Sequence, residues 1–484
     1  MWAPYTVRVS DKAPQNPYTI RPGNPDAADH HGELREIETA LSKRWPENKI
    51  EPSLDRMRAL MDILGQPQRA YPAIHITGTN GKTSTARMIE QLLNTFELRT
   101  GRYTSPHVES VTERISLDGA PISVDKFIET YRDIEPYVEM VDQQQPIAMS
   151  FFEVLTGMAY AAFADAPIDV AVVEVGMGGT WDATNVIDAA VSVITPIGLD
   201  HTDRLGNTTG EIGTQKAGII KTGGLAVVSQ QPLDAAEAIL RRAVEVDATV
   251  AREGMEFGVI RREVAVGGQM VTIRGIGGAE YEDIFIPLHG AYQAHNAALA
   301  LCAVEAFFGV GGKSGGDRLD IDKVRQGFSG VSSPGRLEVI RRSPTVILDA
   351  AHNPHGAQAS VEAIRESFGF SKLVGVIATS GDKDASGFLE AFEPILAEVV
   401  ITENSTHRAT PRRPARRDRG GDLRRGPGPG RAPARRRDRG GDHGGRGGGP
   451  RRRRRHRHRL GDHHRRGPHP AREEVTCGPS APPP

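Results

Sequence analysis

Short apolar runs alternate with helical patterns over most of the chain. Runs of strand length stand at 73–77 (AIHIT), 168–176 (IDVAVVEVG), 190–198 (AVSVITPIG) and 225–230 (LAVVSQ), and residues 82–96 have helical spacing. This alternation predicts an α/β fold with a mainly parallel, doubly wound sheet. Between 258 and 287 the pattern changes to shorter strand-like pieces with glycine turns, and residues 295–308 return to a helix.

A second alternating set begins at LEVI (337–340) and ends with AEVVITEN (397–404). Serine, proline and glycine cluster just before it, which predicts a hinge near 330–336. We therefore expect a central α/β domain over 33–332 and a Rossmann-like C-terminal domain over 333–407. Residues 1–32 are rich in Pro, Asp and Asn without a sustained period, so we expect a disordered leader there, followed by a helix from Glu33 to Lys43.

The amino-acid composition changes at residue 408. Residues 408–484 are rich in Arg, Gly and Pro, with 24 arginines and seven acidic residues, so this tail carries about +17 and the rest of the chain about -18. The tail lacks Ile, Met, Phe, Tyr, Asn and Lys, whose codons begin with two A/T bases. We therefore expect a disordered tail that is the product of a GC-rich gene read in the wrong frame, which would leave the C-terminal domain incomplete. The alternative is a natural Arg/Gly tail that binds RNA.

The remaining composition indicates a soluble cytoplasmic protein. The two cysteines, Cys302 and Cys477, lie in unrelated contexts and offer no disulfide framework or metal cluster. The N-terminus lacks the pattern of a signal peptide, and no apolar run reaches the roughly 18 residues of a membrane span.

A glycine-rich turn between an apolar strand and a helix predicts a phosphate-binding loop. The turn, GTNGKT (78–83), is shorter than the common G-x-x-x-x-G-K-[ST] pattern. Backbone N–H groups and the positive helix end can hold phosphates, Lys82 adds a charge, and Thr83 or Ser84 can offer a hydroxyl to Mg²⁺. A plain glycine turn is the alternative.

A carboxylate ends the next buried-looking strand. Glu174 follows IDVAVV and precedes a glycine-rich stretch that would let the backbone approach a ligand. A metal-binding role is one interpretation, and an ordinary loop or cap residue is the other.

Five separated motifs together resemble the Mur ligase superfamily. They are GTNGKT (78–83), EVGMGGTWDATN (174–185), TPIGLDHTDRLGNT (195–208), DAAHNPHGA (349–357) and, typical of the folate branch, YTSPHVESVTERISLDG (103–119). The chain is thus similar to the bifunctional dihydrofolate synthase/folylpolyglutamate synthases over about residues 33–407. The resemblance implies a P-loop-type ATPase domain followed by a Rossmann-like ligase domain.

The resemblance also implies a reaction. An ATP-dependent amide ligase would move the γ-phosphoryl group to a substrate carboxylate, and L-glutamate would attack the acyl phosphate of dihydropteroate or of a folate. ATP, two Mg²⁺ sites and a monovalent cation are the implied cofactors, and a monomer without nucleic-acid or membrane partners is expected. Another Mur-type ligase, or an inactive nucleotide- or RNA-binding protein, are the alternatives.

Residue roles follow from the same resemblance. Lys82, Lys216 and His352 would be catalytic. The nucleotide would contact Gly78, Thr79, Asn80, Gly81, Lys82, Thr83, Ser84, Gln293, Asn296, Arg336, Asp349 and His352. The metal ions would be bound by Thr83, Glu174, His201 and, if it is carbamylated, Lys216. The substrates would be bound by Ser105, Pro106, His107, Phe151, Phe152 and Lys383.

Several of these residues have plainer readings from the residues alone. Lys216 would be a helical surface lysine, Asn296 a helix cap and Arg336 a surface arginine. His201 would bond a neighbouring loop, and Phe152 would pack in the core.

Overall fold

The computed structural model describes residues 25–45, 51–311, 318–379 and 383–402, together with the residue pairs 416–417 and 423–424. Helix α1 (Pro25–Ser42) begins inside the leader that we expected to be disordered. This corrects the prediction for residues 25–32, where a proline at the first helical position suits the start of a helix. Residues 1–24 lie outside the described residues.

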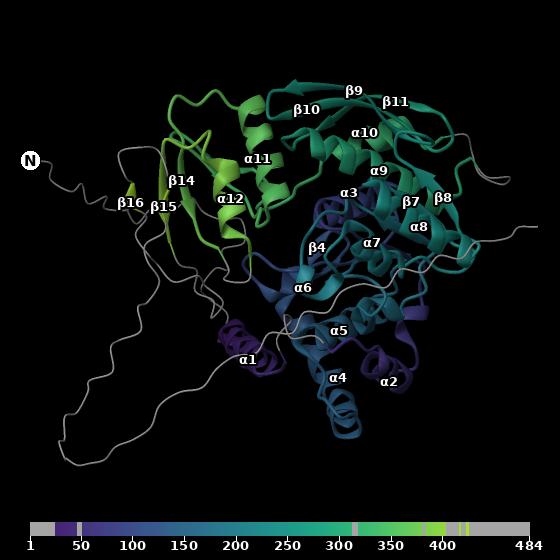
Figure 1. Cartoon of the computed structure of the whole chain (residues 1–484). Coiled ribbons are helices and arrows are strands. Elements are labelled where there is room, and N and C mark those ends of the chain that lie inside the picture. Colours follow the sequence, from purple (N-terminus) through teal and green to yellow (C-terminus); the bar gives the residue numbers. More distant parts are fainter. Residues whose placement is uncertain are drawn as a thin grey trace, which may run out of the picture. The chain divides into compact units, whose positions relative to one another are not determined.

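One eight-stranded sheet organises the central region (Figure 1). Its strand order is β4-β3-β2-β5-β1-β6-β7-β8, with parallel pairing from β2 to β8 and antiparallel pairing at β3 and β4. The strands are β1 (Ala73–Thr77), β2 (Thr100–Tyr103), β3 (Ile115–Leu117), β4 (Ala120–Pro121), β5 (Val170–Glu174), β6 (Val191–Ile194), β7 (Leu225–Val228) and β8 (Thr249–Arg252). The mainly parallel sheet that the sequence predicted is confirmed.

The central strands are apolar on both faces because helices cover both. Along β5, Val170 and Val172 pack into one hydrophobic core, whereas Ala171 and Val173 pack into the other. Side chains alternate between the faces of a strand, so a strand buried on both sides reads as a continuous apolar run. This burial explains why IDVAVVE was recognisable as a strand.

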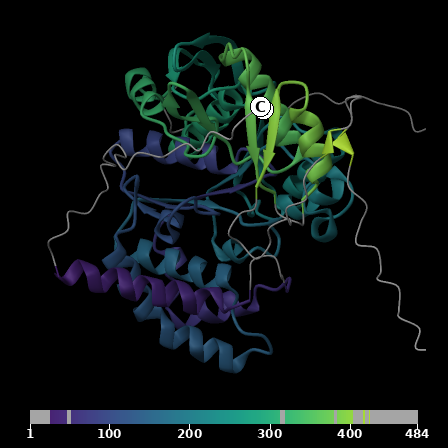
Figure 2. The ribbon, with the colours of Figure 1, turned by 90° about the vertical axis from the view of Figure 1, so that its left-hand side faces the viewer.

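Helices and short 3-10 segments occupy both faces of the sheet, one group of them visible in purple and blue below it in Figure 2. That group, which shares one core, is α1, α2 (Asp55–Ile63), α4 (Val124–Gln144), α5 (Phe151–Asp165) and η3 (Ala183–Val186). On the other face lie α3 (Lys82–Thr95), α9 (Ala291–Phe308) and α10 (Ile321–Ser329), and a third core joins α6 (Thr202–Leu205), α7 (Thr209–Ala217) and α8 (Leu233–Glu245). Two further 3-10 segments are η1 (Pro67–Arg69), between α2 and β1, and η2 (Val111–Arg114), between β2 and β3.

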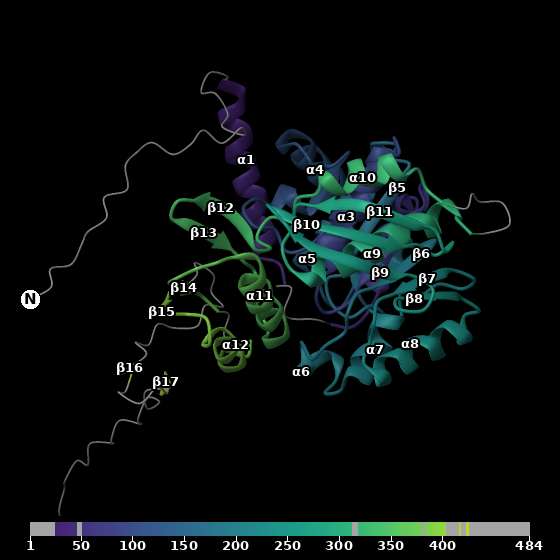
Figure 3. The ribbon, with the colours of Figure 1, turned by 90° about the horizontal axis from the view of Figure 1, so that it is seen from above.

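A small antiparallel sheet packs over α9 (Figure 3). It consists of β9 (Gly258–Ala265), β10 (Gly268–Arg274) and β11 (Glu280–Ile286) in the order β11-β10-β9. These are the shorter strands with glycine turns that the sequence predicted between 258 and 287, and α9 is the predicted helix that follows them.

The C-terminal region has, among its described residues, two separate pairs of strands in place of one continuous sheet. Strands β12 (Glu338–Arg342) and β13 (Thr345–Leu348) form one antiparallel pair, and β14 (Val374–Ile377) and β15 (Glu398–Ile401) form a separate parallel pair. Helices α11 (Pro354–Ser367) and α12 (Ala385–Phe392) connect them. Apolar strand residues stay open to solvent, with Val376 69% and Val400 45% exposed. The expectation that the C-terminal domain over 333–407 is incomplete stays a prediction.

The chain divides into two compact units, Met1–Pro414 and Ala415–Pro484. The expected boundary between residues 332 and 333 lies inside the first unit and stays a prediction. Within the second unit the structure describes only β16 (Arg416–Arg417) paired with β17 (Leu423–Arg424), so the remaining tail lies outside the described residues. None of the helices that the structure describes is long and apolar enough to cross a membrane.

Candidate active site

The turn between β1 and α3 has room only for glycine at two positions. Gly78 and Gly81 have φ angles of 147° and 90°. A Cβ on Gly78 would lie 1.8 Å from the Thr195 hydroxyl, and a Cβ on Gly81 would lie 2.6 Å from the Asn296 amide oxygen. The glycines are therefore required by both backbone conformation and space.

The start of α3 is open to an anion. Gly81 is its N-cap and has no side chain to cap the helix, while the backbone N–H groups of Thr79 and Asn80 donate to the Pro196 carbonyl at 3.0 and 3.4 Å. The first N–H groups of a helix have no intrahelical acceptor and carry the positive end of the dipole. The loop thus fits the predicted phosphate site.

Two lysines converge on the loop from different helices. Lys82 Nζ donates to the carbonyls of Gly78 and Thr79 at 3.2 and 3.3 Å, and Lys216 Nζ on α7 donates to the Gly78 carbonyl at 2.6 Å. Lys216 is only 4% exposed, so its reading as a surface lysine is wrong. Burial lowers the pKa of Lys82, and it lowers the pKa of Lys216 well below its usual value, with the Lys82 charge adding to the effect.

A carboxylate and a hydroxyl face each other beside this loop. Thr83 Oγ1 donates to Glu174 Oε1 at 3.0 Å, and the buried Glu174 Oε2 has no hydrogen-bond partner in the described part of the protein. Burial raises the pKa of Glu174, against the opposing effects of Lys82, the Thr83 hydrogen bond, Arg336 and the nearby backbone N–H of Ser105. An orphaned carboxylate oxygen next to a hydroxyl fits a hard divalent cation such as Mg²⁺.

His201 lies in a different cluster from Glu174. Among the described residues no group of three or more His, Cys, Asp or Glu side chains could hold a metal. His201 Nε2 lies 3.4 Å from Lys383 Nζ and 3.9 Å from Asp200 Oδ2. Burial, with help from nearby lysines, lowers the pKa of His201 to about 4, against the effect of Asp200, so its imidazole is neutral at pH 7.

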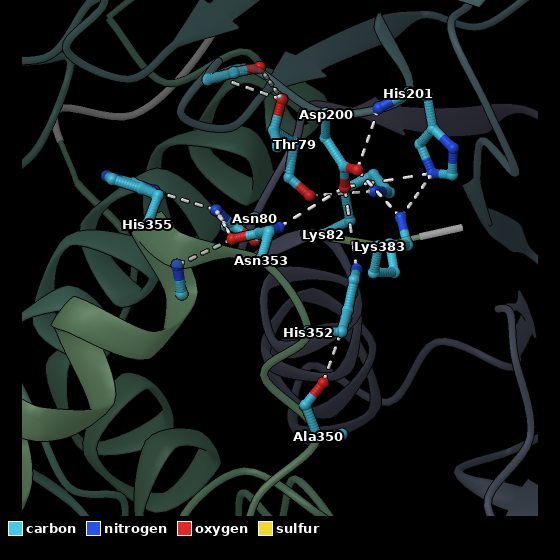
Figure 4. Close-up of polar contacts among 12 residues, drawn as sticks. Thr79, Asn80, Lys82, Asp200, His201, Ala350, His352, Asn353, His355 and Lys383 are labelled. Atoms are coloured by element: carbon cyan, nitrogen blue, oxygen red, sulfur yellow. Dashed lines mark hydrogen bonds and ion pairs between the residues drawn. The ribbon is translucent and has the colours of Figure 1, made fainter. Parts of the chain in front are cut away.

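Asp200 joins the central and C-terminal regions (Figure 4). Its carboxylate accepts from Lys383 Nζ at 2.8 Å and from Asn353 Nδ2 at 3.4 Å, and it lies 3.7 Å from His352 Nε2. Burial alone would raise the pKa of Asp200, but His352, His201 and Lys383 together lower it far below its usual range. The anionic Asp200 therefore gathers three cationic or donor groups from distant segments.

A second junction ties the loop itself to the start of α11 (Figure 4). Asn353 Nδ2 donates to Asn80 Oδ1 at 3.1 Å, and Asn80 Nδ2 lies 2.9 Å from His355 Nδ1. Asn353 also caps α11, because its Oδ1 accepts from the Gly356 N–H at 2.7 Å. The motif DAAHNPHGA thus reaches the phosphate loop directly.

Behind the loop, buried polar side chains bond to one another. Ser84 Oγ lies 3.0 Å from Ser333 Oγ and accepts from Gln293 Nε2 at 3.4 Å, while Asn296 Nδ2 donates to Gln293 Oε1 at 3.0 Å. Asn296 is not the cap of α9, which is Gly290. Gln293 and Asn296 therefore brace the wall behind the loop, and Ser333 anchors the predicted hinge there.

The two other expected nucleotide residues of the C-terminal region differ in their surroundings. Arg336 is half-buried rather than a surface residue, and its charge acts on the pKa of both Lys82 and Glu174, which places it near the loop. The Asp349 carboxylate accepts from the Leu337 and Ala351 N–H groups, each at 3.0 Å. Asp349 thus shapes the backbone of its own region.

The expected substrate residues lie around the segment after β2. Ser105 and Pro106 are joined by a cis peptide bond, and His107 Nδ1 accepts from Arg114 Nε at 2.9 Å. The Arg114 guanidinium carbon lies 5.1 Å from the centre of the Phe151 ring. His107 and Phe151 are therefore linked through an arginine.

The second expected aromatic has a packing role. The Phe152 ring lies 5.7 Å from the Tyr103 ring, and a Cβ on Gly176 would lie 2.5 Å from it. The core-packing reading of Phe152 thus holds in the described structure, although the ring also adjoins the glycine-rich stretch after Glu174.

Sequence reasoning missed four residues of this arrangement: Asp200, Asn353, Ser333 and Arg114. Three of them stand inside motifs that were recognised, LDHTDRLG, DAAHNPHGA and YTSPHVESVTERI. Their position inside these motifs could therefore have marked them as site residues. Ser333 had no such signal, because its contact with Ser84 spans 249 residues of sequence.

The comparisons with known proteins agree with this geometry. The Mur ligase middle domain matches residues 76–304, and the Mur ligase glutamate ligase domain matches residues 335–424, which extends past the expected end of the domain at 407. The dihydrofolate synthase/folylpolyglutamate synthase of Mycobacterium tuberculosis is 54% identical over 394 residues, covering 79% of this chain and 80% of that relative. The chain belongs to the dihydrofolate synthase/folylpolyglutamate synthase family of Mur ligases. Its members are ATP-dependent ligases.

Other relatives support the assignment. The protein of the same name from Bacillus subtilis is 34% identical and covers 75% of this chain and 83% of its own. A crystal structure of the Mycobacterium tuberculosis folylpolyglutamate synthase complexed with ADP matches with a TM-score of 0.75, covering 79% of this chain and 84% of that one. A folylpolyglutamate synthase complex with AMPPCP and folate, 31% identical, matches with a TM-score of 0.70 over 77% of this chain and 88% of that one. The predicted fold, family and ATP-dependent ligase class are confirmed.

Proposed function

We propose that this chain joins L-glutamate to dihydropteroate and to folates through an acyl phosphate, with Mg-ATP as the phosphoryl donor. The observation that carries the proposal is the convergence of the open helix end, Lys82, Lys216 and the Glu174–Thr83 pair on one loop. An anionic carboxylate must approach an anionic triphosphate in this reaction, so fixed donors and cations are needed there.

The residues of this site would have separate roles in the reaction. Backbone N–H groups at the start of α3 and Lys82 would hold the β- and γ-phosphates, and Glu174 with Thr83 would hold Mg²⁺, which supplies charge neutralisation at the γ-phosphate. The substrate carboxylate oxygen takes the phosphoryl group and ADP leaves. The glutamate amine then attacks the acyl carbon, loses a proton and expels inorganic phosphate.

The second cluster suits the amino acid. Lys383 and His352 bring donors to the junction with Asp200, and both come from the C-terminal region, whereas the phosphate loop belongs to the central one. We infer that L-glutamate binds beside this junction with its carboxylates toward Lys383 and His352. Arg336, which acts on both Lys82 and Glu174, would meet the phosphates.

Lys216 is suited to carbamylation. Burial favours its neutral amine, and only the neutral amine adds to CO₂ to give a carbamate and a proton. The product is an anionic oxygen ligand, which would serve a second Mg²⁺ near the loop.

The decisive experiment measures ADP formation by the purified full-length chain. We expect ADP only when ATP, Mg²⁺, L-glutamate and either dihydropteroate or a folate are all present, and mass spectrometry should show the glutamylated product. Substrate labelled with ¹⁸O in its carboxylate should deliver one ¹⁸O to the released phosphate. ADP formation supported equally well by cell-wall precursors would instead indicate another Mur-type ligase, and unlabelled phosphate would exclude the acyl phosphate.

A further inference from the structure

The segment between β2 and β3, which includes η2, packs few apolar side chains in its first half, residues 105–110. It leaves the sheet after Tyr103 and returns at Ile115, which pair with each other, and the Thr104 N–H donates to the Arg114 carbonyl at 2.9 Å. Between these ends Pro106, Val108 and Glu109 are exposed, with Val108 59% exposed. Packing alone therefore does not define the shape of residues 105–110.

One carboxylate lies at the centre of this loop. Glu113 Oε1 accepts from the backbone N–H groups of Glu109 and Ser110, each at 2.8 Å, and Oε2 accepts from Val108 N–H at 2.9 Å. Three consecutive amides thus bond to one side chain. Hydrogen bonds to an ionised acceptor are the stronger kind, and three such bonds fix the course of the backbone.

A capping box reinforces the same turn. Ser110 is the N-cap of η2, and its hydroxyl accepts from Thr112 N–H at 3.3 Å, while Glu113 closes the box by binding the Ser110 N–H. Glu113 therefore holds both the start of η2 and the loop that precedes it.

Arg114, the residue after Glu113, connects this loop to two of the expected substrate residues. Arg114 adjoins Glu113, donates to His107 Nδ1 and lies over Phe151. Because an arginine can only donate, His107 Nδ1 accepts and the imidazole proton sits on Nε2. Loop shape, histidine tautomer and aromatic stacking are thus linked at Glu113 and Arg114.

We propose that Glu113 is a positioning residue for the pterin-bearing substrate: its carboxylate shapes the loop 105–110 and so places Ser105, Pro106 and His107 against that substrate. The inference rests on the proposed function. Glu113 need not touch the substrate, and the hydrogen bonds that the structure describes for its carboxylate go to residues 108–110 and not to the phosphate loop. Its loss should therefore weaken binding of the folate substrate while leaving ATP binding intact.

The test compares two glutamates of the same loop. Glu109 contributes its backbone N–H, but within the described residues its carboxylate accepts no hydrogen bond, so Glu109→Ala removes the same charge without removing the bonds. We expect Glu113→Ala to raise the KM for dihydropteroate or folate about tenfold or more, with the KM for ATP and kcat within about twofold. Glu109→Ala should match the wild type.

Glu113→Gln gives an intermediate case. Its carbonyl oxygen can keep two of the bonds, but its amide group would turn a donor toward the third N–H, so its KM should fall between those of the wild type and Glu113→Ala. The graded series also covers the case in which the alanine variant does not fold.

Amide hydrogen exchange without any substrate separates this inference from the proposed function. We expect the amides of Val108, Glu109 and Ser110 to exchange faster in Glu113→Ala than in Glu109→Ala, and the amide that loses its acceptor to exchange faster in Glu113→Gln as well. Exchange in both Glu113 variants equal to that in Glu109→Ala, or a KM change shared by ATP and folate, would overturn the positioning role. If the wild type forms no glutamylated product, the proposed function fails, and so does a role for Glu113 in placing this substrate, whereas the exchange result still decides whether Glu113 shapes the loop.

Discussion

Substituting Gly81 by alanine tests whether the phosphate loop depends on glycine for space as well as for backbone freedom. Gly81 precedes α3 with a φ angle of 90°, and its missing Cβ would lie 2.6 Å from Asn296 Oδ1. The side chain that blocks the position is itself held, because Asn296 Nδ2 donates to Gln293 Oε1 at 3.0 Å. An added methyl group must therefore move either the loop or this buried amide.

The cost has two parts. The left-handed backbone conformation costs an L-residue about 1–2 kcal/mol. Displacing the buried Asn296 amide from its hydrogen bond costs about 1–3 kcal/mol more. We expect Gly81→Ala to lower the free energy of unfolding by about 2–5 kcal/mol in total. A loop that shifts to avoid the clash should bind ATP at least about tenfold more weakly, which corresponds to roughly 1.4 kcal/mol.

Gly65 provides the matched control. Its φ angle is also positive, at 76°, but nothing lies within 4 Å of its missing Cβ. Gly65→Ala should therefore show only the backbone cost, about 1–2 kcal/mol, with unchanged ATP affinity. Urea unfolding followed by circular dichroism gives the stabilities, and calorimetric titration with ATP gives the affinities. If Gly81→Ala were no more costly than Gly65→Ala and bound ATP like the wild type, the steric reasoning would be wrong.

Four further expectations follow from the described contacts and the sequence. Glu174→Gln should reduce ADP formation roughly a hundredfold or more, because a metal ion at this site would supply several kcal/mol of charge stabilisation, and excess Mg²⁺ should restore part of it. The bidentate pair between Arg262 and Glu366, with both N–O distances at 2.6 Å, should give a coupling energy of about 1 kcal/mol in a double-mutant cycle of urea unfolding. Burial lowers the pKa of His75 well below that of the unfolded chain, so the His75 contribution to stability should be constant above about pH 6.5 and fall below it by up to about 1.4 kcal/mol per pH unit. His75→Gln should reduce this slope below about pH 6.5. Deleting residues 408–484 should leave ligase activity unchanged if the tail arises from a frame error, whereas salt-sensitive RNA binding that disappears on deletion would support a natural basic tail.

The sequence allowed prediction of the parts of the fold where one periodicity dominates. The strands β1, β5, β6 and β7 are buried on both faces and read as apolar runs, and their alternation with helices indicated a parallel sheet. The start of α1 was misplaced because PDAADHHG contains proline and many polar residues, yet these residues suit the first turns of a helix whose apolar face begins only at Leu34.

Site residues could be predicted where a short sequence motif contains the functional side chains themselves. Lys82, Thr83 and Glu174 are adjacent in space because strand ends in a parallel sheet share an edge, which the sequence pattern implies. The burial of Lys216 could not be read from GTQKAGIIK, because it depends on how α7 packs against the loop. Asp200 was overlooked because its role arises only when Lys383 and His352 reach it from residues far along the chain.

In the C-terminal region, the strand-helix pattern of the sequence stops after β15, and apolar strand residues there are exposed. Strands β14 and β15 pair in parallel, and their residues alternate between exposed and half-buried, as in a sheet covered on one face only. Val374, Val376 and Val400 are apolar but exposed, and a Rossmann-like sheet would cover such positions with a helix or extend beyond them with another strand. The residues after 407 offer few apolar side chains for either purpose, since the tail has Leu423, Leu460 and Val475 among its arginines. Exposed apolar strand residues followed in the sequence by a segment poor in apolar residues are expected when a complete domain is read out of frame. Translating the coding DNA near codon 407 in all three frames would show whether a covering strand and helix are encoded there.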